Sequence, residues 1–189
     1  NKRQAGEDFY FLHKIISLGN FTNLSQTRVI PSPRPSDRVP FGTGKAVRAF
    51  MDHGGLGTYP LDAFRDLKGF FDLVPDLYHA TEGEFAAALQ SAPESLLTFL
   101  PDQHFESAWQ EIRENTSSES AFCKRFFQWF NGFRAMKFVH HARDHFYGEQ
   151  KVAREANRLL QILPGFADGS APRSIRELLQ IYRVLDRKT

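Results

Sequence analysis

The 189-residue chain has the length and composition of a globular protein with one core. Hydrophobic residues make up 41% of it and aromatic residues 14%, including 19 phenylalanines, which excludes a disordered or fibrous chain. The formal net charge is +2, from 24 Lys and Arg against 22 Asp and Glu. So balanced a charge argues against nucleic acid as a partner, because surfaces that hold a phosphate backbone are strongly basic.

Three predicted elements come first in the chain. A helix is expected over residues 6–18, where apolar side chains recur at helical spacing. A strand is expected over residues 21–30, which are rich in β-branched residues and end at Pro31. A loop over residues 31–41 follows, because its four prolines exclude a helix interior.

The rest of the chain predicts helices separated by Pro and Gly. One helix is expected over residues 45–52, and Pro60 and Pro101 each begin another. Thr116 and Glu119 have the spacing of a capping box, which predicts a long and central helix after them. The apolar face of that helix is expected to carry Phe122, Phe126, Trp129, Phe133 and Met136.

Two more helices complete the predicted fold. One is expected to end at Pro164, and the last is expected to begin with a second capping box, formed by Ser174 and Glu177. No second strand-rich region and no internal repeat is visible. The fold class is therefore predicted as mainly α: an irregular helical bundle that follows a short helix-strand-loop segment.

Two motifs near the start of the chain point to a family. Residues 2–12 read Lys-Arg-Gln-Ala-Gly-Glu-Asp-Phe-Tyr-Phe-Leu, and residues 31–44 read Pro-Ser-Pro-Arg-Pro-Ser-Asp-Arg-Val-Pro-Phe-Gly-Thr-Gly. The first motif resembles the helix that carries the acidic pair in family-two inverting glycosyltransferases of the GT-A fold. The second resembles the stretch that follows one strand later in a bacterial branch of that family. The resemblance covers residues 1–50, about a quarter of the chain.

This resemblance implies that the chain is the carboxy-terminal part of a longer enzyme of carbohydrate biosynthesis. Residues 1–45 would be the remnant of the α/β catalytic domain, and residues 46–189 a helical extension. In the family, the donor-binding half comes first and holds Mg²⁺ or Mn²⁺ through an Asp-x-Asp element. The 189 residues contain no Asp-x-Asp. A divalent metal is therefore expected in the intact enzyme and none in this fragment, which should not transfer sugar alone.

Glu7 and Asp8 are the catalytic residues that the resemblance implies. Inverting transfer needs a base that takes the proton from the acceptor hydroxyl as its oxygen attacks the anomeric carbon. By resemblance Asp8 is that base, and Glu7 orients the acceptor or tunes Asp8. The alternative is that both carboxylates only complement the dipole at the start of a helix.

The proline-rich loop supplies candidate binding residues. Arg34 and Arg38 present planar guanidinium groups that suit a diphosphate or an anionic acceptor. Ser36 and Thr43 are assigned with them to donor or acceptor binding. The alternative is that these cations only solvate a surface. Residues 42–45 are similar to a phosphate loop, but Val39 stands where the Walker pattern requires glycine, which excludes nucleotide hydrolysis.

Two other functions stay open. A non-catalytic helical module for protein–protein interaction fits the amphipathic helices that make up three quarters of the chain. A metal-dependent enzyme would use His141 and His145, which are one helical turn apart, with His140 beside them. The alternative for these histidines is that they are polar side chains at the end of a long helix.

The expected location is the cytoplasm, or the inner membrane surface. Cys123 has no second cysteine with which to form a disulfide, and no run of residues is apolar enough for a membrane span. The partners that we expect are a nucleotide-sugar donor, a hydroxyl acceptor and the donor-binding half. A homo-oligomer is also compatible with the sequence.

Overall fold

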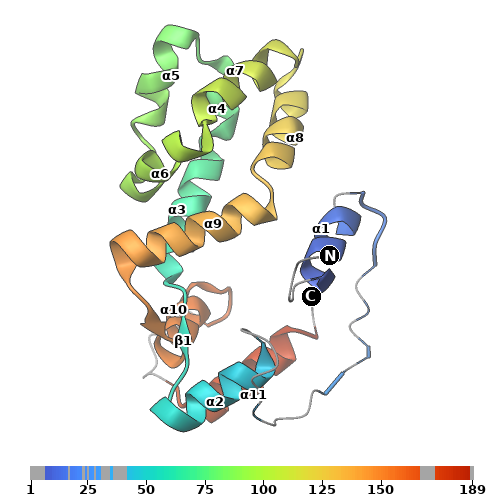
Figure 1. The fold of residues 1–189 in the computed structure, drawn as a ribbon, viewed down its shortest axis with the longest axis vertical. Helices are drawn as coiled ribbons and strands as arrows, with labels where there is room; N and C mark the ends of the chain where they lie inside the picture. The colour runs from blue at the N-terminus through green and yellow to red at the C-terminus, as the bar shows by residue number, and fades with distance from the viewer. Residues whose placement is uncertain are drawn as a thin grey trace. The chain divides into compact units, whose positions relative to one another are not determined.

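The computed structural model describes residues 7–16, 18–22, 24, 26, 27, 29, 30, 35, 42–166 and 173–187. Within the first range, it describes the side chains of residues 10–12 and 14–16. The described residues are mainly helical, which confirms the predicted fold class (Figure 1). The chain forms two compact units. Unit 1 contains Asn1–Thr58 and Gln150–Thr189, and unit 2 contains Tyr59–Glu149. The predicted boundary between a catalytic remnant and an extension at residues 45 and 46 concerns ancestry and stays a prediction.

In its described residues, unit 1 combines four helices with one short antiparallel strand pair. In this pair Gly57 lies opposite Lys151, and Thr58 lies opposite Gln150. The elements of unit 1 are α1 (Glu7–Ile16), α2 (Thr43–His53), β1 (Gly57–Thr58), β2 (Gln150–Lys151), α10 (Val152–Ile162) and α11 (Ile175–Leu185).

Local signals explain three of these helix ends. Helix α2 ends at Gly54, whose φ of 67° is in the left-handed region that glycine tolerates best. Helix α11 begins with the predicted capping box, in which the Ser174 hydroxyl accepts from the Glu177 amide and the Glu177 carboxylate accepts from the Ser174 amide. Helix α10 ends at Ile162, two residues before Pro164, as the sequence predicts.

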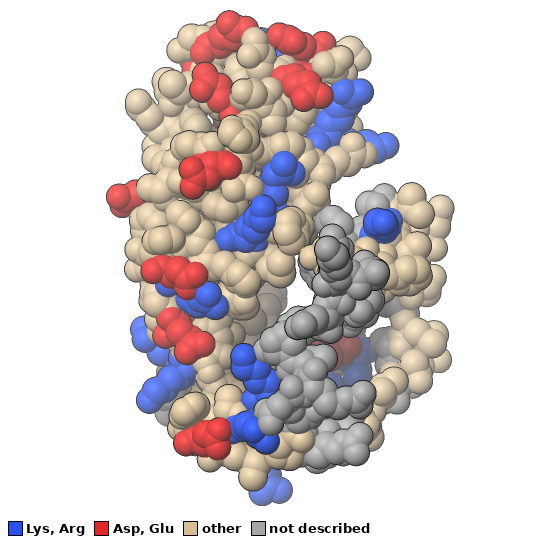
Figure 2. Space-filling model, in the orientation of Figure 1, with Lys and Arg blue, Asp and Glu red and all other residues tan. Residues whose placement is uncertain are grey.

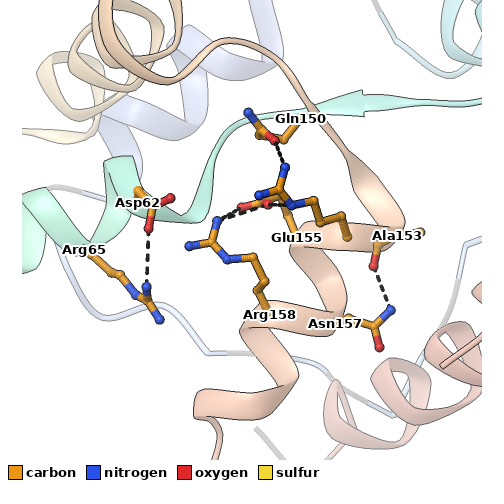
Figure 3. A network of polar contacts seen from close by, with 8 residues as sticks. Asp62, Arg65, Gln150, Ala153, Glu155, Asn157 and Arg158 are labelled. Carbon is orange, nitrogen blue, oxygen red and sulfur yellow. Dashed lines mark hydrogen bonds and ion pairs between the residues drawn. The ribbon is translucent and has the colours of Figure 1, made fainter. Parts of the chain in front are cut away.

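Hydrogen bonds connect helix α10 with helix α11 and with the residue just before its cap. The Asn157 side chain exchanges two hydrogen bonds with the backbone of Arg173, at 2.9 and 3.1 Å, and the Tyr182 hydroxyl donates to the Ala156 carbonyl at 2.7 Å. On α10 the buried Glu155 carboxylate accepts a hydrogen bond from the Arg158 guanidinium at 3.0 Å (Figure 3). This pairing satisfies a charge that would be costly to bury alone.

Unit 2 is a helical bundle built from short elements. They are α3 (Leu61–Asp72), α4 (Val74–His79), α5 (Glu82–Leu89), α6 (Glu94–Phe99), the 3₁₀ turn η1 (Pro101–Gln103), α7 (Phe105–Glu114), α8 (Glu119–Trp129), α9 (Gly132–Ala142) and the π-helix η2 (Arg143–Tyr147). As predicted, α3 begins immediately after Pro60.

Aromatic side chains form the centre of unit 2. Phe70 is fully buried, and its ring meets the rings of Phe105 and Phe126 edge-on, with centroids 5.6 and 5.8 Å apart. Trp109 stacks on Phe85 at 4.2 Å, and its indole Nε1 donates to a backbone carbonyl at 2.8 Å. Such offset and edge-on pairs add to the free energy of burial. Eight of the 19 phenylalanines of the sequence are buried in this core.

The prediction of one long central helix is wrong, because the structure has two helices there, α8 and α9. Phe130 leaves the helical region with φ −84° and ψ 62°, and the Asn131 side chain then accepts hydrogen bonds from the amides of Phe133 and Arg134. A side chain that satisfies the first free amides begins a new helix. As a result Phe126 is buried, whereas Met136 is 37% exposed.

Three other local predictions are corrected. Ser118, not Thr116, caps α8, and the Thr116 hydroxyl instead donates to the Ile112 carbonyl at the end of α7. Pro101 begins a 3₁₀ turn, and α7 starts only after His104, whose φ is 54°. No strand occurs at the described positions of residues 21–30. A strand needs a neighbour for its backbone groups, and the described chain gives this segment none.

Candidate functional site

The acidic pair opens helix α1. Glu7 and Asp8 are its first two residues, in the turn where backbone amides have no partner within the helix. The positive end of the helix dipole favours a carboxylate in its ionised form at this position. The predicted helix is thus confirmed over Glu7–Ile16, and the pair lies at its start. The positions of these two side chains fall outside the described residues.

Within the proline-rich loop over residues 31–41 the structure describes Pro35, and the description resumes at Gly42. Arg34, Ser36 and Arg38 lie outside the described residues, so their predicted roles stay predictions. Thr43 is the first residue of α2 and is exposed. Gly42 precedes it with φ 101°, a conformation that favours glycine, and Lys45 follows in the first turn. In unit 1, helix α1 therefore begins within the motif of residues 2–12, and helix α2 begins at the end of the motif of residues 31–44.

The histidine string on α9 and η2 makes hydrogen bonds within unit 2. His140 stacks on Tyr59, and its Nε2 lies 2.6 Å from the Tyr59 hydroxyl. The Nε2 of His141 lies 3.1 Å from the hydroxyl of Thr98 on α6, and the His141 and His145 rings are 4.6 Å apart. Across the described ranges, no three or more His, Cys, Asp or Glu side chains are grouped to hold a metal ion.

The electrostatics of this string favour a neutral His141. Burial lowers the pKa of His141, and the neighbouring His145 lowers it further. Beside them Arg143 binds the Asp144 carboxylate through two nitrogens, at 2.7 and 3.1 Å, and this bond lowers the pKa of Asp144. The contacts of His140 with Tyr59 and of His141 with Thr98 connect α9 to other parts of unit 2.

A three-residue polar network in unit 2 was not anticipated from the sequence. The Asp66 Oδ2 atom on α3 accepts from the buried Ser95 hydroxyl at 2.5 Å and from the Tyr147 hydroxyl at 2.6 Å. Burial raises the pKa of Tyr147, and so does Asp66, so the phenol stays protonated and donates. Because the three residues are far apart in sequence and belong to no motif, spacing alone contained no signal for them.

Comparison with protein-family models, with curated proteins and with solved structures gave no match. Among the described residues, no helix has both the length and the apolar character needed to cross a bilayer.

Proposed function

We propose that the chain is the carboxy-terminal part of an inverting glycosyltransferase, which moves a sugar from a nucleotide-sugar donor to an acceptor hydroxyl. The observation that carries the proposal is the order and spacing of the two motifs in residues 1–50. The helix that opens with Glu7 and Asp8 supports it, because the catalytic pair of this family lies on a helix. In this proposal Asp8 is the base and Glu7 is the residue that orients the acceptor.

The reaction needs four parts that act together. Asp8 takes the proton of the acceptor hydroxyl while the oxygen bonds to the anomeric carbon from the face opposite the leaving diphosphate. The bond from that carbon to the diphosphate oxygen breaks, and Arg34 and Arg38 offset the negative charge that develops there. Ser36 and Thr43 are proposed to bind the donor or the acceptor.

The metal of the family belongs to the donor-binding half. The residues of this chain do not fit a metal site: they include no Asp-x-Asp, and the described part of the chain has no suitable group of ligands. We therefore assign the nucleotide and the metal to the donor-binding half. The 189-residue chain alone is expected to transfer no sugar.

The exposed apolar side chains of α1 support the proposal that a donor-binding half packs against this chain. Phe11, Leu12 and Ile16 are each more than half exposed, and Leu12 and Ile16 lie one helical turn apart on α1. Exposed apolar patches of this kind mark surfaces that pack against another part of a protein. In the proposed enzyme, the donor-binding half covers this side of α1 and brings the donor to Asp8.

The test compares Asp8→Asn with Glu7→Gln in an enzyme that contains both halves. Asp8→Asn removes the base and keeps the shape of the side chain, so transfer should fall by roughly 100-fold to 10,000-fold while donor affinity changes little. Glu7→Gln should reduce transfer less. Transfer rates and donor affinities are measured on both variants. Transfer by Asp8→Asn at the parental rate would remove Asp8 from the role of base.

The second candidate is a non-catalytic interaction module. It is favoured by the exposed apolar side chains of α1 and by Phe50 and Met51, which are exposed on α2. It predicts binding to a partner protein with no effect of Asp8→Asn on that binding. Activity of the two-part enzyme that depends on Asp8 decides for the glycosyltransferase.

A further inference from the structure

The two units differ sharply in charge, which the overall value of +2 conceals. Residues 59–149 contain 14 Asp and Glu against 8 Lys and Arg, a formal net charge of −6. Residues 1–58 and 150–189 together contain 16 Lys and Arg against 8 Asp and Glu, a formal net charge of +8. On unit 2, Figure 2 shows acidic side chains gathered over α5 and α7. Unit 1 by itself is therefore basic enough to attract an anionic partner.

Helix α11 presents basic and apolar side chains next to each other. Arg176 and Arg183 are seven residues apart on α11, so both fall on one side of the helix axis, and Arg187 lies in the turn that follows the helix. Ile175 and Leu179 form the neighbouring strip and are 55% and 52% exposed. These five residues are called the α11 strip below.

The α11 strip borders the side that α11 uses to pack within unit 1. On the inner side Leu178 is buried, and the Tyr182 hydroxyl reaches the Ala156 carbonyl on α10. The apolar side of the helix is thus buried at Leu178 and exposed at Ile175 and Leu179, where Arg176 and Arg183 border it. Helix α2 also exposes apolar side chains, Phe50 and Met51, and has no buried residue.

We propose that unit 1 binds an anionic phospholipid surface through the α11 strip, with α11 lying in the plane of the membrane interface. Arginines bind the negative headgroups, and the apolar side chains next to them enter the boundary of the acyl chains. Helices α2 and α11 have 11 residues each. They are therefore about 16 Å long, too short to span a hydrocarbon core of about 30 Å.

The apolar side chains of the α11 strip favour lipid over the other anionic partner, nucleic acid. A phosphate backbone requires cations alone, and exposed Ile175 and Leu179 would add nothing to it. A lipid surface uses both kinds of side chain. The acidic unit 2 is repelled by the same surface, so only unit 1 is drawn to it. This inference rests on α11 and on the charge of unit 1, and it does not depend on the proposed role of Asp8.

The experiment measures binding of the 189-residue chain to vesicles by co-sedimentation. Vesicles of mixed phosphatidylcholine and phosphatidylglycerol are compared with phosphatidylcholine alone, at low and at high salt. We expect binding to the mixed vesicles only, weakened by salt because the Debye length shortens. Equal binding to both kinds of vesicle would overturn the proposal, since charge would then have no role.

Two triple variants with the same change in charge locate the binding surface. Arg176→Gln, Arg183→Gln and Arg187→Gln together should weaken binding by at least ~10-fold, because each cation near an anionic surface contributes a factor of roughly five. The matched control changes Lys124→Gln, Arg125→Gln and Lys137→Gln in unit 2 and should bind as the parent does. Circular dichroism confirms that both variants keep their helices.

The apolar half of the α11 strip has a separate test. Ile175→Ser with Leu179→Ser should also weaken vesicle binding, while binding to a DNA oligonucleotide should be negligible for all forms of the chain. Tight DNA binding that is lost in the arginine variant and kept in the serine variant would overturn the proposal in favour of nucleic acid. Unchanged vesicle binding in the arginine variant would overturn it as well.

Discussion

Unit 2 buries most of its large apolar side chains, whereas the described part of unit 1 exposes most of its own. The aromatic cluster around Phe70 and Phe126 lies entirely within residues 59–149. In the described part of unit 1, the buried hydrophobic residues are Leu160 and Leu178. Large hydrophobic side chains that remain exposed are concentrated on α1, α2, α10 and α11. The difference indicates that unit 2 is stabilised by its own core, whereas the described part of unit 1 leaves much of its apolar surface uncovered.

The largest expected effect compares a core residue of unit 2 with a surface residue of unit 1. Phe126→Ala should lower the free energy of unfolding by about 3–5 kcal/mol, because it leaves a cavity among packed rings. Leu179→Ala should cost less than about 1 kcal/mol, because its side chain is half exposed. Urea denaturation of both variants provides the measurement. Similar losses in the two would contradict the comparison between the units.

A second pair of variants compares tyrosine hydrogen bonds in the two units. Tyr147→Phe removes a donor from the Asp66 carboxylate and should cost about 1.5–3 kcal/mol, as expected for a bond to a charged group. Tyr182→Phe removes a donor from the Ala156 carbonyl and should cost about 0.5–1.5 kcal/mol. Thermal and urea unfolding report both values. The reverse order would show that the Asp66 network contributes little to unit 2.

The smallest expected effect is a pH dependence of stability that comes from unit 2. The pKa of His141 in the folded protein is below its ordinary value of 6.5. The unfolded chain therefore binds the proton more readily, so this contribution to stability is present above about pH 6.5 and is lost as the pH falls below it. His141→Gln should reduce the slope of the urea midpoint against pH in this range. His53→Gln, on α2 of unit 1, is the control and should leave the slope as it is.

Local signals in the sequence were enough to predict the helical elements in many places. The capping box at Ser174, the helix after Pro60 and the end of α10 before Pro164 all depend on residues within one or two turns. The break between α8 and α9 was missed, because apolar spacing continues across it from Phe126 to Phe133. There the cap supplied by Asn131 outweighs the continuing apolar pattern.

The site could be predicted only in part, for a different reason. The acidic pair and the Arg-containing loop are contiguous motifs, and a resemblance can reveal these. Asp66, Ser95 and Tyr147 meet only after α3, α6 and η2 pack, so no local pattern contains them. The charge difference between the units was hidden for a similar reason, since unit 1 is assembled from both ends of the chain.

The β1–β2 pair has a consequence for how such a chain can evolve. The chain leaves unit 1 after Thr58 and re-enters it at Gln150, and these two residues are paired neighbours. Paired residues in antiparallel strands have Cα atoms about 5 Å apart. A short hairpin turn bridges that distance equally well. The whole of residues 59–149 therefore occupies the position of a turn, where insertion, loss or replacement of a module would leave the strand pair of unit 1 intact.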